Sequence, residues 1–331
     1  MDKIVVLDFG SQYSHLICRR IREFSVYAEL VPFDISYEEL QKHNPKGIIF
    51  SGGPSSVYSS DAPVPESKIF DMNLPLLGIC YGHQLIVNKY GGKVKRANKE
   101  YGSSLLTIDN DKDLLNGVGE SVRAWMSHGD EAEEIPPGFQ VIGHTESAKA
   151  AAIASDEKSV YGIQFHPEVV HTEQGTEILK NFVLKVCGAS QDWTMEGFID
   201  SAVEKISKIE GNVLCGVSGG IDSTVAALLI HKAIGDRLKC VFVNNGLLRL
   251  NEETEIETMF KDNFNVNFTS INAVDNFLDK LKGVEDPEKK RKIVGEEFVN
   301  VFTEFAEKNG PFKWLAQGTL YPDVIESVSA S

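Results

Sequence analysis

LPLLGICYGHQLIVNKYGG (Leu74–Gly92) joins a short apolar run to a cysteine flanked by glycines and then to a segment with helical spacing. The apolar run is typical of a buried parallel strand, and the glycines near Cys80 allow a sharp turn between strand and helix. At such a turn the side chain stands clear of the backbone, and the N-terminus of the next helix favours a thiolate. Cys80 is therefore either a nucleophile, if the chain supplies a base, or a buried structural cysteine.

The order of apolar and amphipathic segments predicts a two-domain α/β protein, with a mainly parallel central sheet flanked by helices in each domain. We expect a first domain at 1–187, a small polar linker at 188–193 and a second domain at 194–331. Between 103 and 164 the first domain changes to shorter strand-like pieces. The runs expected as parallel strands are 3–10, 47–53, 74–80, 212–217, 239–245, 266–272 and 313–318.

Composition excludes several classes of protein. The net charge of −15 argues against a broad nucleic-acid surface, and no apolar run approaches the roughly 20 residues of a membrane span. Five cysteines, an odd number without paired spacing, indicate a reducing compartment. We therefore expect a cytoplasmic protein with neither a nucleic-acid nor a membrane partner.

The base for Cys80 is predicted in GIQFHPEVVH (162–171), which reads as strand-like sequence. Side chains at i and i+2 of a strand share a face about 6.6 Å apart, so Glu168 can orient the imidazole of His166. Pro167 removes a ladder donor and places the pair at a strand end or edge. The alternative is a surface histidine and glutamate beside a turn; His171 is a weaker candidate base because it lacks the i+2 carboxylate.

Donors for an oxyanion are predicted in SGGP (Ser51–Pro54), which ends the strand-like run GIIF. A nucleophile that attacks a carboxamide needs such donors for the developing negative charge. We expect the backbone N–H groups of Gly53 and Tyr81 to form this oxyanion hole, although glycine-proline turns without any function are common.

Five motifs of the first domain together resemble class I glutamine amidotransferases, from residue 3 to about 186 and in the order of that family. The resemblance implies that Cys80, His166 and Glu168 form a triad that hydrolyses glutamine through a glutamyl thioester. It also implies that Gln84 and the backbone of Ser127 and His128 hold the amino-acid end of glutamine. The motifs are LDFGSQY (7–13), SGGP (51–54), GICYGHQ (78–84), WMSHGD (125–130) and QFHPE (164–168).

A second chemistry is predicted at VSGGIDST (Val217–Thr224), which follows a strand-like run and opens a helix. The N–H groups of Ser218, Gly219 and Gly220 can form an anion cradle at the helix N-terminus, with further donors from nearby hydroxyls. The stretch lacks the lysine of a kinase-type phosphate loop. Asp222 would repel a phosphate unless Mg²⁺ lay between them, so we expect Asp222 to be a metal ligand.

This stretch resembles the signature of the N-type ATP pyrophosphatases, which cleave ATP between the α and β phosphates and activate an oxygen as an adenylate. The resemblance implies ATP as a cofactor, beside the Mg²⁺ expected at Asp222, and places Val243 near adenine. The residues that it implies for ATP binding are Ser218, Gly219, Gly220, Ile221, Asp222, Ser223, Thr224 and Val243.

Three further stretches resemble the GMP synthase family: CVFVNNGLLRLNE (240–252), DPEKKRKIVG (286–295) and WLAQGTLYPDVIES (314–327). The resemblance implies that glutamine, ATP and xanthosine 5′-monophosphate (XMP) are substrates and that GMP, AMP and pyrophosphate are products. Asn244 stands where an aspartate is expected in this family. The alternatives are another glutamine-dependent ATP pyrophosphatase, such as an NAD synthetase, or a non-catalytic remnant, against which the intact triad positions count.

GMP synthases continue well past the position at which PDVIESVSAS (322–331) ends this sequence. Full-length members of the family are expected to be homodimers through a C-terminal domain that also helps to bind XMP. The resemblance therefore leads us to expect a C-terminally incomplete pyrophosphatase domain without the dimerisation region.

Overall fold

The computed structural model describes residues 1–319, apart from the side chains of 97–99. Contacts divide the chain into two compact units, 1–194 and 195–331. The loop predicted at 321–327 lies outside the described residues.

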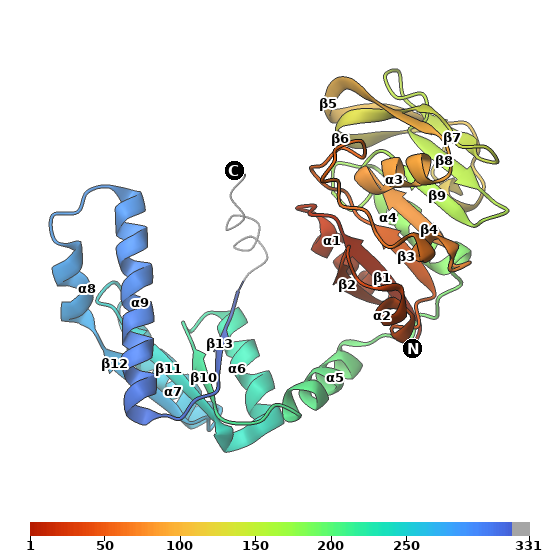
Figure 1. Cartoon of the computed structure of the whole chain (residues 1–331). Coiled ribbons are helices and arrows are strands. Elements are labelled where there is room, and N and C mark those ends of the chain that lie inside the picture. Colours follow the sequence, from red (N-terminus) through yellow and green to blue (C-terminus); the bar gives the residue numbers. More distant parts are fainter. Residues whose placement is uncertain (320–331) are drawn as a thin grey trace. The chain divides into compact units, whose positions relative to one another are not determined.

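Unit 1 is built on one nine-stranded sheet with the strand order β2-β1-β3-β4-β9-β8-β7-β5-β6 (Figure 1). Strands from β2 to β9 are parallel, and the remaining pairs, from β9 to β6, are antiparallel. The strands are β1 (Lys3–Asp8), β2 (Tyr27–Pro32), β3 (Gly47–Phe50), β4 (Leu76–Ile79), β5 (Lys93–Ile108), β6 (Ser121–Glu134), β7 (Gln140–His144), β8 (Ala152–Ser155) and β9 (Val160–Ile163).

The sheet of unit 1 is covered on both faces because successive side chains of a strand point to opposite sides. Ile4 and Val6 of β1 pack in one core, which also contains residues of α1 and α4. Val5 and Leu7 pack in a second core, with residues of α2 and α3. The α-helices are α1 (Ser14–Glu23), α2 (Tyr37–Lys42), α3 (Tyr81–Lys89) and α4 (Gly175–Lys180). The other helical segments are the 3₁₀-helices η1 (Ser67–Asp71) and η2 (Asp113–Leu115) and the π-helix η3 (Asn181–Val186).

Unit 2 contains a four-stranded, all-parallel sheet with the order β12-β11-β10-β13. The glycine-rich stretch follows β10, and Asn244 ends β11, so both lie at the carboxyl edge of this sheet, where open α/β sheets bind ligands. The strands are β10 (Val213–Gly216), β11 (Leu238–Asn244), β12 (Phe268–Asn272) and β13 (Trp314–Gln317). The helical segments are α5 (Met195–Ser207), α6 (Ile221–Ile234), η4 (Gly235–Arg237), α7 (Glu252–Thr258), η5 (Met259–Asn263), α8 (Val274–Leu281) and α9 (Pro287–Asn309).

The predicted class, two α/β domains with parallel sheets, is confirmed. One detail of the prediction is wrong: the strand expected through His166 and Glu168 ends at Ile163, and the residues that follow form bends and turns. The segment predicted as a linker packs along unit 1, because Ser190 N donates to Asp2 (3.0 Å) and Trp193 N donates to Ser25 O (2.9 Å).

Candidate active site

Cys80 lies between β4 and α3 in a strained backbone conformation. Its φ of 52° and ψ of −103° fall outside the regions that non-glycine residues normally adopt. A Cβ atom at Gly78 would lie 2.3 Å from Gly82 O, and one at Gly82 would lie 2.5 Å from Phe50 O. Positions 78 and 82 must therefore be glycine, and the turn has the geometry of a nucleophile elbow.

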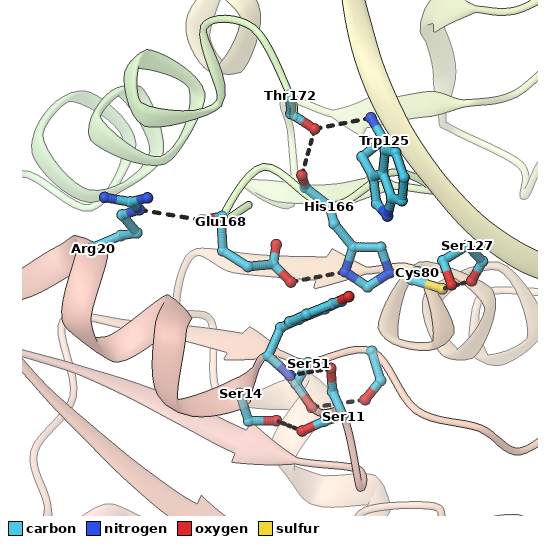
Figure 2. Close-up of polar contacts among 12 residues, drawn as sticks. Ser11, Ser14, Arg20, Ser51, Cys80, Trp125, Ser127, His166, Glu168 and Thr172 are labelled. Carbon is cyan, nitrogen blue, oxygen red and sulfur yellow. Dashed lines mark hydrogen bonds and ion pairs between the residues drawn. The ribbon is translucent and has the colours of Figure 1, made fainter. Parts of the chain in front are cut away.

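His166 and Glu168 lie just beyond β9, and the chain bends so that their side chains meet. His166 Nδ1 is 2.7 Å from Glu168 Oε1, and both side chains are buried. Burial disfavours the imidazolium, but the Glu168 charge and hydrogen bonds with Cys80 and Glu168 together raise the pKa of His166 well above its usual range. Figure 2 shows the His166 ring between Glu168 and Cys80. The arrangement is that of a thiol, an imidazole and an orienting carboxylate.

Long-range contacts hold the His166–Glu168 segment in this bend. Thr172 Oγ1 donates to His166 O (2.6 Å) and accepts from Trp125 N of β6 (2.9 Å), as Figure 2 shows. Arg20 Nε of α1 donates to Glu168 O (3.1 Å). Sequence reasoning missed Thr172 and Arg20, and no local pattern indicated them, since their partners lie in other elements of unit 1.

The SGGP turn after β3 passes close to the Cys80–His166 pair. A Cβ atom at Gly52 would lie 3.0 Å from His166 Cε1 and 3.6 Å from Cys80 Cβ, so a side chain at this position would press on the imidazole. Within residues 1–319, the N–H groups of Gly53 and Tyr81 donate to no protein acceptor. Two unused donors near the cysteine are what the predicted oxyanion hole needs; that role stays a prediction.

Ser127 contacts Cys80, and Gln84 and His128 share a contact with Asp130 O. Gln84 is buried one helical turn after Cys80, and its Nε2 donates to Asp130 O (2.9 Å). Ser127 O lies 3.5 Å from Cys80 Sγ. His128 Nδ1 is 3.1 Å from Asp130 O and its Nε2 is 3.2 Å from a Glu100 carboxylate oxygen. Burial lowers the pKa of His128, and the Glu100 carboxylate only partly offsets this effect.

In unit 2, the glycine-rich stretch after β10 forms a tight loop at the N-terminus of α6. Gly219 has a φ of +78°, and a Cβ atom there would lie 2.5 Å from Ile256 Cδ1, so this position requires glycine. The predicted anion cradle is partly occupied by the loop itself, because Ser218 N donates to Ser223 Oγ (3.2 Å) and Gly220 N donates to Ser218 Oγ (3.3 Å). A phosphate would have to replace these bonds.

The remaining hydroxyls of the loop also brace it. Ser223 Oγ and Thr224 Oγ1 donate to Gly220 O, at 3.1 Å and 2.8 Å. Ile221 and Asp222 are exposed in the first turn of α6, where backbone N–H groups have no intrahelical partner. The free donors of this turn are therefore those that a phosphate can reach first.

Val243 and Asn244 end β11 next to this loop. The Val243 side chain is 4% exposed and packs in a core with Leu214 and Val241, which leaves its backbone as the group able to meet a base. Asn244 Nδ2 donates to Glu253 Oε2 (2.6 Å). An aspartate at 244 would face the Glu253 carboxylate at this distance, so the amide removes a repulsion between two like charges.

A metal ion at this edge would have few protein ligands. Within the described part of the chain, no group of three or more His, Cys, Asp or Glu side chains could hold one. Asp222 is a single exposed carboxylate beside the loop. Mg²⁺ is usually bound by one or two carboxylates together with substrate phosphates, so this residue fits an ion that arrives with a nucleotide.

Among the described helices, none has the length and apolar character needed to cross a membrane.

A strained cysteine with an imidazole–carboxylate pair, at the carboxyl edge of a parallel sheet, is the arrangement that a cysteine-dependent hydrolase requires. The Glutamine amidotransferase class-I family model matches residues 5–186, more than half of the chain. The chain belongs to this family. The NAD synthase family model matches residues 193–298.

Among individual proteins, the chain is similar to GMP synthases (glutamine-hydrolysing). It is 51% identical over 332 residues to that of Brachyspira hyodysenteriae and 52% identical over 333 residues to that of Bacillus cereus. These alignments cover 99% and 100% of this chain but 65% of the length of each relative. One solved structure, of a protein from Thermoplasma acidophilum that carries the name of a GMP synthase subunit, is 31% identical, with a TM-score of 0.52. That match covers 57% of this chain and 94% of the other.

Proposed function

We propose that unit 1 hydrolyses glutamine to glutamate and ammonia, with Cys80 as nucleophile, His166 as acid and base, and Glu168 as the carboxylate that orients His166. The contact of a strained, glycine-flanked cysteine with a buried histidine–glutamate pair carries the proposal. His166 takes the proton of the Cys80 thiol, the sulfur attacks the carboxamide carbon, and the N–H groups of Gly53 and Tyr81 stabilise the oxyanion.

His166 then gives its proton to the leaving nitrogen, and ammonia departs as the thioester forms. A water molecule loses a proton to His166 and attacks the thioester carbon, which releases glutamate and restores the thiol. Throughout, the Glu168 carboxylate holds Nδ1 of the imidazole, so that Nε2 faces the sulfur. Gln84 and the backbone of Ser127 and His128 would hold the amino-acid end of glutamine, and the contact of Ser127 O with the sulfur supports this assignment.

Release of glutamate by the wild-type chain and by Cys80→Ala tests this proposal. We expect the variant to lose several orders of magnitude in kcat because no other group can form the thioester. Cys18→Ala is the matched control, since Cys18 is buried in the core and burial raises its thiol pKa to about 12. Glutamate release by Cys80→Ala at the wild-type rate would overturn the assignment.

For the protein as a whole, we propose amination of XMP to GMP, with ATP cleaved to AMP and pyrophosphate. The similarity to GMP synthases over the described chain and the loop after β10 support this function. The loop would hold the ATP phosphates at the N-terminus of α6, and Asp222 would hold Mg²⁺, which neutralises phosphate charge when bound. A cytoplasmic location belongs to the same proposal, and homodimers are expected of the full-length members of the family.

The competing function is amidation of another adenylated substrate, as in an NAD synthetase, and the match of the NAD synthase family model favours testing it. Pyrophosphate release with glutamine, Mg·ATP and either XMP or nicotinate adenine dinucleotide separates the two. XMP-dependent release with AMP as the second product is expected. Release only with the dinucleotide, or ADP as the primary product, would refute the proposal.

A further inference from the structure

A second amide side chain contacts the candidate nucleophile. Gln164 follows β9, two residues before His166, and is 1% exposed. Its Nε2 lies 3.7 Å from Cys80 Sγ, a hydrogen-bonding distance for sulfur, and its backbone N–H donates to Ala151 O (2.8 Å). Gln164 therefore has a fixed backbone and points a buried donor at the reacting atom.

The orientation of the Gln164 amide follows from its other neighbour. Gln84 Nε2 donates to Asp130 O at 2.9 Å, and a carbonyl oxygen can only accept, so this end of Gln84 must be the amino group. The same amino group lies 3.5 Å from Gln164 Oε1. A reversed Gln164 amide would set two amino groups against each other and its oxygen against the sulfur. A chain of hydrogen bonds therefore links Asp130 O, Gln84, Gln164 and Cys80.

Some groups around the Cys80 sulfur favour its thiol form and others favour its thiolate form. Ser127 O, 3.5 Å away, accepts a hydrogen bond from a thiol and repels a thiolate. An amide N–H does the reverse, because a donor stabilises the charged sulfur. Together with the imidazolium of His166, the Gln164 amide therefore offsets the carbonyl and favours the reactive form.

We propose that Gln164 is a further catalytic residue, which donates its side-chain N–H to the Cys80 thiolate and is oriented for this by Gln84. The inference rests on the proposed glutaminase function of unit 1. It assigns Gln84 a second role, as a positioning residue, beside its predicted contact with glutamine.

The test is the pH dependence of alkylation of Cys80 by iodoacetamide, which reports the thiolate and needs no glutamine. Gln164→Met keeps the length of the side chain but removes the donor. We expect the midpoint of the alkylation profile to rise by about one pH unit, so that the rate at any pH below the wild-type midpoint falls about tenfold, with the rate in Cys80→Ala subtracted. Gln140→Met, on the exposed start of β7, is the matched control and should leave the profile unchanged.

Gln84→Met provides a second test by the same alkylation profile, which can be made even if Gln164→Met does not fold. It should shift the midpoint in the same direction by a smaller amount, and the double variant should match Gln164→Met alone, because Gln84 acts through Gln164. A wild-type midpoint in either single variant, or additive shifts in the double variant, would refute the inference.

The two proposals fail separately. Loss of glutamate release in Cys80→Ala with unchanged alkylation midpoints would refute the role of Gln164 and leave the glutaminase standing. Glutamate release by Cys80→Ala would refute the glutaminase itself. When both proposals hold, Gln164→Met lowers kcat with little change in KM, because the lost bond stabilises the nucleophile and does not touch glutamine.

Discussion

Replacing Glu168 by glutamine isolates the contribution of one buried charge. The variant keeps the shape of the side chain and of the bend after β9, while the carboxylate that faces His166 Nδ1 at 2.7 Å becomes neutral. Opposite charges with centres about 4 Å apart attract each other by about 4 kcal/mol at an effective dielectric constant near 20. Because the imidazolium is the acid that protonates the leaving nitrogen, the variant loses this attraction in the transition state.

We therefore expect Glu168→Gln to lower kcat for glutamate release by about 10³-fold, with KM little changed. The amide adds a second penalty when its amino group faces Nδ1, because it then selects the tautomer whose other nitrogen no longer accepts the Cys80 proton. Glu177→Gln is the matched control, since Glu177 lies on α4 with a partly exposed side chain and only a 3.8 Å contact with Lys180.

Stability gives an independent readout of the same pair. The raised pKa of His166 means that the folded protein keeps a proton above pH 6.5 that the unfolded chain releases. The resulting stabilisation is fully present below pH 6.5 and is lost as the pH rises through the raised value. The difference in free energy of unfolding between wild type and Glu168→Gln should therefore shrink from pH 6 to pH 9.

If Glu168→Gln released glutamate with a kcat within threefold of wild type, the role of the carboxylate would be refuted.

Three further changes test other parts of the structure. Burial lowers the pKa of His83 to about 3, so its neutral form stabilises the fold above pH 6.5 and this stabilisation is lost towards pH 3. Compared with His83→Phe, wild type should lose about 2 kcal/mol more in urea unfolding between pH 7 and pH 5. An equal loss of unfolding free energy in wild type and His83→Phe would contradict this role of His83. Thr172→Val removes both hydrogen bonds of the hydroxyl, so it should lower the free energy of unfolding by about 2 kcal/mol and reduce kcat. Thr172→Ser keeps the hydroxyl and should retain wild-type stability and kcat. A valine variant with wild-type stability and kcat would show that the bend after β9 does not depend on these bonds. Asp222→Asn should weaken ATP binding about tenfold in calorimetry with Mg²⁺ but not without it, and an unchanged Mg²⁺ dependence would exclude Asp222 as a ligand.

The local patterns predicted those parts of the fold that local physics determines. Cys80 was identifiable because a strained turn between a buried strand and a helix needs glycine at 78 and 82, and the clashes at both positions bear this out. Gly219 was predicted only as a donor of the anion cradle, and its need for glycine emerges from its φ of +78° and the closeness of Ile256. The two parallel sheets follow from continuous apolar runs bounded by turns.

The geometry between distant segments could not be predicted in this way. A strand through His166 and Glu168 would hold the two side chains about 6.6 Å apart along the chain, whereas the observed bend brings their polar atoms to 2.7 Å. That bend depends on Thr172 bonding to β6 and on Arg20 of α1, which are tertiary contacts without a local signal. Gln164 had a weak signal, since it stands in the same QFHPE motif, but its contact with Cys80 depends on how β9 pairs with β4.

Covalent labelling of Cys80 by a glutamine analogue is the most direct test of the central claim, that this thiol attacks the glutamine carboxamide. An analogue with a diazomethyl ketone in place of the carboxamide forms a thioether with the attacking sulfur and releases N₂. We expect one equivalent bound per chain, found by peptide mass spectrometry at Cys80, with glutamine protecting against it and His166→Ala slowing it strongly. Labelling of another residue, or undiminished labelling of Cys80→Ala, would contradict the claim.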